Sequence, residues 1–359
     1  MRVIRFLLIP FALLYGLGTE VRNLLYNKGL AASFSFTIPV ISVGNLTVGG
    51  TGKTPMIEYL IKKLAFQHHT IMLSRGYKRK TKGFKLAGVD DKASTIGDEP
   101  YQIYRKFHDH AGVAVGEDRA LAITEILARV PDTKLILMDD AYQHRTVNPA
   151  MNILLTDFNR PFYKDYLLPV GNLRELRYQA RRADVVLVSK CPPNLNATKM
   201  DLIEKEVNNY TKDNIPVYFT SLKYLEPKSV FNKTEFKSDN VYAFTGIASP
   251  DPFMKFLRNN YLVAGQRNFP DHFDFSGDVL QNKIVKPYRA MQNPDIALVC
   301  TEKDAARLVN NPDLERVLKG LPLFYVPVEV YFLRGEQTFL SMVKNKIDEI
   351  RVKTEEAEL

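Results

Sequence analysis

The stretch Val43-Gly44-Asn45-Leu46-Thr47-Val48-Gly49-Gly50-Thr51-Gly52-Lys53-Thr54-Pro55 decides the fold of this chain. It follows the apolar run 40–43, which is typical of a buried strand, and it precedes apolar residues spaced as one face of a helix. A strand, a glycine-rich loop, Gly-Lys-Thr and a helix form the context in which a loop binds phosphate. Glycines turn successive backbone N–H groups toward one point, and the helix N-terminus adds positive potential there.

The side chains of this loop suit a nucleoside triphosphate with Mg²⁺. Lys53 can reach the β- and γ-phosphates, and the Thr54 hydroxyl can ligate Mg²⁺. Thr47 stands where the general pattern has glycine, so a glycine-rich turn beside a chance Gly-Lys-Thr is the alternative interpretation. The residues expected to surround the phosphates are Gly49, Gly50, Thr51, Gly52, Lys53 and Thr54.

Composition sets limits on the class of protein. A chain of 359 residues with 45% hydrophobic and 25% charged residues is globular and can form one large domain or two ordinary ones. Cys191 and Cys300 lie far apart without metal-ligand spacing, which indicates a reducing compartment. The net charge of +9 indicates an anionic partner: nucleic acid, acidic lipid headgroups or a phosphorylated substrate.

The N-terminal segment is apolar from residue 6 to residue 18, with basic residues before it. This run is shorter than the ~20 residues that a spanning helix needs. We interpret residues 2–28 as a helix that lies in, or partly enters, the inner membrane face. A signal peptide and an ordinary core helix are the alternatives.

Strand-like apolar runs alternate with helical patterns through the first half of the chain. This alternation predicts an α/β fold, a P-loop NTPase-like parallel sheet with helices on both faces. In such sheets the ligand lies at the carboxyl ends of the strands. The runs are 40–43, 70–73, 113–115, 135–138, 153–155 and 185–188, and polar residues follow several of them at 74–75, 139–140, 157 and 189–190.

A second, smaller α/β lobe is predicted to begin near Pro216. Its expected strands are 217–219, 241–244, 296–299 and 324–326, and a helical pattern from Phe339 to Ile347 closes the chain. The predicted division is 1–30 for the membrane-associated helix, 31–215 for the P-loop core, 216–330 for the second lobe and 331–359 for the C-terminal helix.

Several side chains outside the loop could take part in chemistry. Asp139-Asp140 follows a four-residue apolar strand, as the second magnesium element of phosphate-loop enzymes does. Asp98 is either a helix cap or a general base, and His272, among aromatic residues, is either a packed histidine or the partner of such a base. Arg174-Glu175 is either a surface salt bridge or an arginine on phosphate with a carboxylate near the metal.

Three classes of phosphate-loop protein compete for this sequence. A GTPase needs an Asn/Thr-Lys-x-Asp element, which neither the segment 189–192 nor the segment 301–304 provides. A membrane-associated partition ATPase needs a second lysine before the glycine pair, where this chain has Val48. These absences favour a small-molecule or lipid kinase, and a membrane-associated ATPase or GTPase switch without a lipid acceptor remains the alternative.

The chain resembles the tetraacyldisaccharide 4′-kinases, the inner-membrane lipid A 4′-kinases, over nearly its whole length. The departure at Thr47 is similar to that family's own pattern. The motifs that carry the resemblance are Leu14-Tyr15, Arg22, Leu25-Tyr26 and Gly29, the loop 43–55, Ser74-Arg75-Gly76-Tyr77, Gly97-Asp98-Glu99-Pro100, Asp118-Arg119, 139–145, Leu173-Arg174-Glu175, Gly246-Ile247-Ala248, Asp271-His272-Phe273 and 301–305.

The resemblance implies transfer of the γ-phosphate of ATP to the 4′-hydroxyl of a lipid-embedded disaccharide 1-phosphate, with Mg²⁺, at the cytoplasmic face of the inner membrane. It implies neither a nucleic-acid partner nor an obligate protein partner. It also implies two lobes joined by a flexible strand pair, with the last helix returning to the first lobe. The implied roles are a base at Asp98 paired with His272, a catalytic Lys53, a magnesium side made by Thr54, Asp139, Asp140 and Glu175, and contacts to nucleotide or acceptor from Tyr77, Arg119, Gln143 and Arg174.

Overall fold

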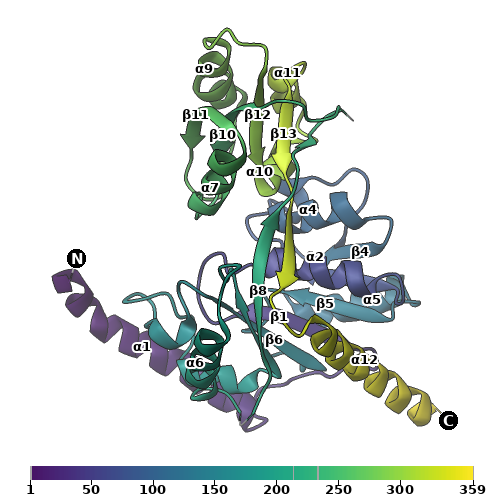
Figure 1. Ribbon diagram of the computed structural model, residues 1–359. Coiled ribbons are helices and arrows are strands. Elements are labelled where there is room, and N and C mark those ends of the chain that lie inside the picture. The colour runs from purple at the N-terminus through teal and green to yellow at the C-terminus, as the bar shows by residue number, and fades with distance from the viewer. Residues whose placement is uncertain (1, 213, 233, 359) are drawn as a thin grey trace.

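The computed structural model describes residues 2–212, 214–232 and 234–358. It contains two β-sheets with helices packed on them, and the smaller sheet stands beyond the end of the larger one (Figure 1). The predicted class, an α/β fold with a mostly parallel large sheet and a smaller second lobe, is confirmed.

The larger sheet has the strand order β14-β8-β7-β6-β1-β5-β2-β4-β3. The strands from β8 to β4 in this order run parallel, and β14 and β3 pair antiparallel at the two edges. The bounds are β1 (Val40–Asn45), β2 (Thr70–Ser74), β3 (Lys85–Leu86), β4 (Ala111–Val115), β5 (Leu135–Asp139), β6 (Met151–Asp157), β7 (Val185–Ser189), β8 (Val217–Tyr224) and β14 (Val328–Phe332).

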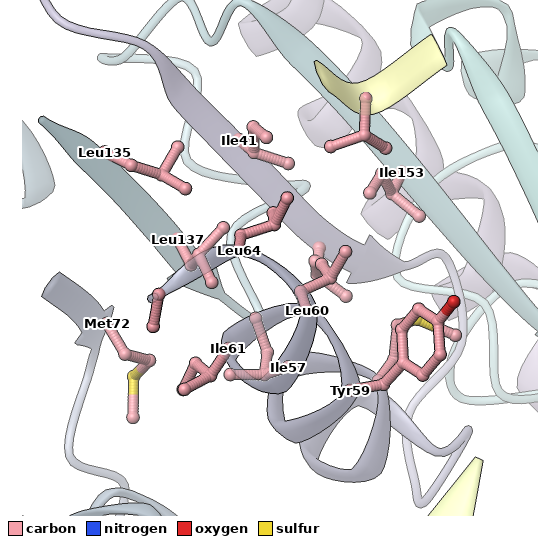
Figure 2. Close-up of a cluster of buried hydrophobic side chains, with 14 of the residues drawn as sticks. Ile41, Ile57, Tyr59, Leu60, Ile61, Leu64, Met72, Leu135, Leu137 and Ile153 are labelled. Atoms are coloured by element: carbon pink, nitrogen blue, oxygen red, sulfur yellow. The ribbon is translucent and has the colours of Figure 1, made fainter. Parts of the chain in front are cut away.

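Helices cover both faces of the larger sheet because its central strands are apolar on both sides. On one face, Leu60 and Leu64 of α2 pack against Ile41 of β1 and Leu137 of β5 (Figure 2). On the other face, Ile123 and neighbouring residues of α5 pack against the alternate residues of β1, β2 and β5. The helices of this lobe are α2 (Lys53–Leu64), α3 (Ala93–Ile96), α4 (Asp98–Phe107), α5 (Arg119–Arg129), α6 (Ala197–Asn208) and the 3₁₀ turns Phe162–Lys164 and Arg177–Arg182.

The smaller sheet has the strand order β11-β10-β12-β13-β9, with only β9 antiparallel to its neighbour. Its strands are β9 (Lys228–Ser229), β10 (Asn240–Thr245), β11 (Leu262–Asn268), β12 (Ile296–Thr301) and β13 (Leu323–Val326). Its helices are α7 (Asp251–Asn260), α8 (Gly277–Leu280), the π-turn Gln281–Val285, α9 (Lys286–Arg289), α10 (Glu302–Leu308) and α11 (Pro312–Leu318).

The strands β8 and β14 connect the two lobes as an antiparallel pair, from Val328 opposite Tyr224 to Phe332 opposite Thr220. Residues 217–219 were expected in the second lobe, and this expectation is wrong, because β8 pairs with β7 in the larger sheet. An apolar run shows that a segment is a strand but not which sheet it joins. The other predicted domain limits stay predictions.

The two terminal helices both contact the larger lobe. In α12 (Glu336–Glu358), Phe339, Val343 and Ile347 are buried in the same core as α2. In α1 (Arg2–Asn27), Asn23 is fully buried, whereas a row of apolar side chains is exposed. No helix among the residues that the structure describes has the length and apolarity needed to cross a membrane. The exposed apolar residues of α1 are Leu7, Ile9, Phe11, Leu13, Leu14, Tyr15, Leu17, Val21, Leu24 and Leu25.

Candidate active site

The phosphate loop joins β1 to α2 as the sequence predicts. Gly49 and Gly52 have φ angles of 100° and 86°, which a side chain would strain, and Lys53 begins the helix directly after Gly52. The ammonium of Lys53 lies 3.2 Å from Asn45 Oδ1 and 3.5 Å from Asp140 Oδ1. These two contacts hold the Lys53 side chain beside the loop, between Asn45 and Asp140.

Asp139 ends β5, the strand beside β1, and is 1% exposed. Neither of its carboxylate oxygens has a hydrogen-bond partner in the described part of the chain. Burial raises the pKa of Asp139 to about 7, and the charges of Glu99 and Asp140 add to this rise while Lys53 opposes it. A buried carboxylate without partners is costly, and a bound cation would supply what it lacks.

Asp140 is paired, unlike its neighbour. Its two oxygens accept hydrogen bonds from Arg174 at 3.0 and 3.1 Å, and Lys53 is its second cation. Burial works to raise the pKa of Asp140, but Lys53 and Arg174 outweigh it and hold the pKa below its ordinary value. The residue has a φ angle of 48°, so the backbone is strained where it holds this carboxylate in place.

Glu175 lies under the site and is bound by several donors. It is 1% exposed and accepts from Asn23 of α1 at 3.0 Å, from Gln143 at 3.2 Å, and from Arg182. Gln143 also donates to the carbonyl of Asn45 at 3.0 Å, which places it between this carboxylate and the phosphate loop. The expected magnesium role of Glu175 stays a prediction, and in this structure the carboxylate joins α1 to the site.

The residues present fit Mg²⁺, although within residues 2–212, 214–232 and 234–358 no group of three His, Cys, Asp or Glu side chains could hold a metal by itself. Mg²⁺ at phosphate sites is typically held by one or two carboxylates, with water and substrate phosphates as the other ligands. The unpartnered oxygens of Asp139, which ends the strand beside β1 and is followed by Asp140, match that requirement.

Asp98 and His272 come from different lobes and meet, with His272 Nδ1 3.1 Å from Asp98 Oδ2. Asp98 is the first residue of α4, and Gly97 before it has a φ of 97°; a Cβ there would lie 3.0 Å from Gly76 Cα. Arg307 Nε donates to the same oxygen of Asp98 at 2.7 Å. Burial works to raise the pKa of Asp98, but the hydrogen bond from His272 and the charge of Arg307 lower it below its ordinary value.

Sequence reasoning missed two cations at this pair, Lys303 and Arg307 of α10. Lys303 Nζ lies 3.3 Å from His272 Nε2 and 3.1 Å from Glu99. Arg307 Nη1 donates to Oδ1 of the fully buried Asp304 at 3.0 Å, and this contact holds the guanidinium in place. The charged residues that follow β12 indicated a possible site at the end of that strand. Their contact with Asp98 could not be predicted, because Asp98 lies about two hundred positions earlier in the sequence, in the other lobe.

Tyr77 and Arg119 differ in exposure. Tyr77 is 61% exposed, and its ring stands edge-on to the ring of His272 with centroids 5.6 Å apart.

Arg119 has no exposed surface, and its Nε and Nη2 lack partners among the described residues. Burial lowers the pKa of Arg119 to about 10, against the charges of Asp139 and Asp140. Arg119 therefore lies beneath the site, and its predicted contact with nucleotide or acceptor stays a prediction.

Comparison with known proteins shows which family the chain belongs to. The model of the tetraacyldisaccharide-1-P 4′-kinase family matches residues 4–348. The chain belongs to this family. The tetraacyldisaccharide 4′-kinase of Flavobacterium johnsoniae is 41% identical over 94% of this chain and 96% of its own length. That of Bacteroides fragilis is 41% identical over 92% of this chain and 89% of its own.

A solved structure extends the likeness to three dimensions. The protein LpxK from Aquifex aeolicus, determined in complex with ATP, superposes with a TM-score of 0.74 at 28% identity, covering 96% of this chain and 99% of its own. The predicted family and the predicted enzyme class, an ATP-dependent phosphotransferase, are confirmed. The alternative of a switch protein without an acceptor is not favoured.

Asp139→Asn is expected to abolish Mg²⁺-dependent phosphoryl transfer by this kinase and to raise the midpoint of thermal unfolding of the nucleotide-free protein. The aspartate's pKa is raised from 3.8 to about 7, so its destabilising charge is absent below pH ~4, grows as the pH rises, and is complete above pH ~7. The stability gain should therefore be larger at pH 8 than at pH 5, as measured by calorimetry.

Asp304→Asn is the matched control for this experiment. Asp304 is also fully buried, but its oxygens accept from Thr245 at 2.7 Å and from Arg307 at 3.0 Å. Removing that charge should lower the midpoint. A lower unfolding midpoint for Asp139→Asn as well would contradict the claim that the buried charge of Asp139, when no cation is bound, destabilises the folded protein.

Proposed function

We propose that this chain transfers the γ-phosphate of ATP to the 4′-hydroxyl of a tetraacyldisaccharide 1-phosphate held in a membrane. The observation that carries the chemistry is the contact of 3.1 Å between Asp98 and His272 across the two lobes. It gives the site a carboxylate with an orienting histidine, which can take the proton of an attacking hydroxyl, whereas a nucleotide switch has no acceptor hydroxyl to deprotonate.

The phosphate side of the reaction is assigned to the loop and β5. Lys53 would lie on the β- and γ-phosphates, and Thr54 with Asp139 and Asp140 would hold Mg²⁺. Mg²⁺ held there would neutralise negative charge on the phosphates during transfer. Glu175 would join this group once its Oε2, which accepts from both Gln143 and Arg182, is released by both.

The acceptor side is assigned to the second lobe and α4. The 4′-hydroxyl oxygen attacks the γ-phosphorus, the bond between that phosphorus and the β–γ bridging oxygen breaks, and ADP leaves. The hydroxyl proton passes to Asp98, which its lowered pKa keeps ionised at neutral pH. His272 orients the carboxylate, and Tyr77, exposed beside His272, would contact the sugar.

The contact of Asp98 with His272 needs the two lobes to stay close, because the two residues stand on different lobes, and an opening of the lobes would separate the base from its histidine. Arg174 and Gln143 would act on the phosphate side, where Arg174 already pairs with Asp140. Arg119 would reach substrate only after a rearrangement that frees its buried guanidinium.

The helix α1 is proposed to lie in the cytoplasmic leaflet of the inner membrane, where ATP and the lipid acceptor are both accessible. Its exposed apolar residues form a surface that water disfavours. Its polar residues contact the site: Tyr15 donates to the Arg174 carbonyl at 2.9 Å, and Asn23 donates to Glu175 at 3.0 Å. The net charge of +9 suits an anionic leaflet, which attracts basic residues by ~1 kcal/mol each.

The double substitution Leu13→Glu with Leu17→Glu is expected to weaken binding to anionic vesicles by about 10-fold or more, since burying each leucine contributes about 1.5 kcal/mol or more. Both side chains are exposed, at 68% and 64%, so the fold should persist and ATP affinity should not change. Vesicle co-sedimentation measures the effect, and Leu121→Glu, an exposed leucine on α5, is the control. Unchanged sedimentation of the double variant would exclude α1 as the membrane contact.

The proposed reaction is tested with purified protein, γ-labelled ATP, Mg²⁺ and the lipid disaccharide 1-phosphate in detergent. Label in the lipid with wild type is the expected result. ATP hydrolysis on vesicles with unlabelled lipid would refute the acceptor and restore the switch alternative.

A further inference from the structure

Three side chains outside the loop bind the outer face of the phosphate loop. Ser189 Oγ donates to the Thr51 carbonyl at 2.7 Å, and the ammonium of Lys190 donates to the Gly50 carbonyl. Arg160 Nη2 donates to the Val48 carbonyl at 2.9 Å. These donors lie at the carboxyl ends of two strands: Arg160 follows β6, Ser189 is the last residue of β7 and Lys190 comes directly after it. In the sheet β6 is the neighbour of β1, and β7 is the neighbour of β6. We call Arg160, Ser189 and Lys190 the carbonyl clamp.

The clamp determines where the loop's N–H groups point. In a planar trans peptide the carbonyl and the next residue's N–H point in opposite directions. Carbonyls of residues 48, 50 and 51 held on the outer side therefore direct the N–H groups of Gly49, Thr51 and Gly52 to the phosphate side. Within the described ranges, none of these N–H groups has a hydrogen-bond acceptor in the protein, so they are free to bind phosphate oxygens.

The clamp is itself held in place. Lys190 has a φ angle of 57°, which is unfavourable for a lysine, and its ammonium lies 2.8 Å from the buried carboxylate of Asp157. Ser189 Oγ also lies 3.2 Å from the Thr156 carbonyl. A Cβ on Gly49 would lie 2.8 Å from Arg160 Nη2, so the guanidinium packs closely over the loop. These contacts fix the positions of the three clamp side chains, and the clamp in turn fixes the conformation of the phosphate loop.

We propose that Arg160, Ser189 and Lys190 are positioning residues for phosphoryl transfer, which act by orienting the loop N–H groups toward the β- and γ-phosphates of ATP. Donors that are oriented before the reaction do not have to reorganise as charge develops on the transferred phosphate. This inference rests on the proposed function, because it takes the loop to be the phosphate site of the kinase.

The test measures nucleotide affinity by calorimetry for ATP, ADP and AMP, without lipid, on full-length Ser189→Ala, Lys190→Met and Arg160→Met. ATP and ADP should bind about 10-fold more weakly to each of the three variants, because loosened donors lose contact with the β- and γ-phosphates. AMP affinity should change less than about 2-fold, since AMP lacks those phosphates. The conservative Lys190→Arg keeps a donor and should recover most of the ATP affinity.

The control is Lys212→Ala, which removes an exposed lysine paired with Asp184 at 3.6 Å in the same lobe. It should leave the affinity for all three nucleotides unchanged. Equal losses for AMP, ADP and ATP, or no loss in Ser189→Ala, would overturn the clamp. Because lipid is absent, these outcomes are separate from failure of the acceptor: a wild type that binds ATP but leaves the lipid unlabelled refutes only the proposed reaction.

Discussion

Replacing Lys53 with alanine is expected to lower the rate of lipid phosphorylation by about 10²- to 10³-fold, since the loss of one donor to developing charge commonly costs that much. The ammonium lies between Asn45 Oδ1 and Asp140 Oδ1 and is mostly buried, so water cannot replace it. Its loss also removes one of the two cations that hold the pKa of Asp140 low. Initial rates with labelled ATP, together with ATP affinity, measure the effect.

Lys63→Ala is the matched control for this variant. Lys63 stands on the same helix α2, is half-exposed and pairs with Glu336 at 2.9 Å, away from the loop. It should retain nearly all activity and show a similar unfolding midpoint. Near-normal turnover in Lys53→Ala would remove the phosphate loop from the mechanism.

Most of the larger lobe was predictable because its strands are short apolar runs followed by polar residues. The runs at 40–43 and 135–138 became β1 and β5, and Asp139 lies beside Val43 because the two strands are parallel neighbours. The assignment of residues 217–219 to the second lobe failed because apolarity does not encode sheet order, which depends on long-range pairing. Strand existence is a local property, whereas strand partnership is not.

The site was predictable to the extent that its residues lie at strand ends or in recognisable motifs. Asp139 and Lys53 lie where the sequence predicts. The partners of Glu175 could not be predicted, because Asn23 comes from a helix more than a hundred residues earlier. Arg307 was missed for the same reason, since its partner Asp98 is on the other lobe. Side-chain pairing across lobes depends on the angle between them, which sequence patterns do not report.

Replacing Asp98 with asparagine is expected to lower kcat by about 10³-fold, within the range for loss of a general base, with little change in ATP affinity. Asparagine retains the shape and an oxygen for Arg307 but cannot accept the hydroxyl proton. Because the pKa of Asp98 is held below 3.8, wild-type activity should not fall through protonation of this group above pH ~4. Rates of lipid phosphorylation at saturating ATP measure the change.

The pairing with His272 makes a stronger test through a double-mutant cycle. If Asp98 and His272 act as one unit, Asp98→Asn with His272→Ala should cost about as much as Asp98→Asn alone, since groups that act together are non-additive. Asp274→Asn, an exposed carboxylate two residues from His272, is the control and should keep normal activity. Fully additive losses would mean that the contact of 3.1 Å does not serve the chemistry. A loss of ATP affinity with kcat preserved would instead make Asp98 a helix-terminal or ligand-contact residue, and the base would have to be another group on the acceptor side.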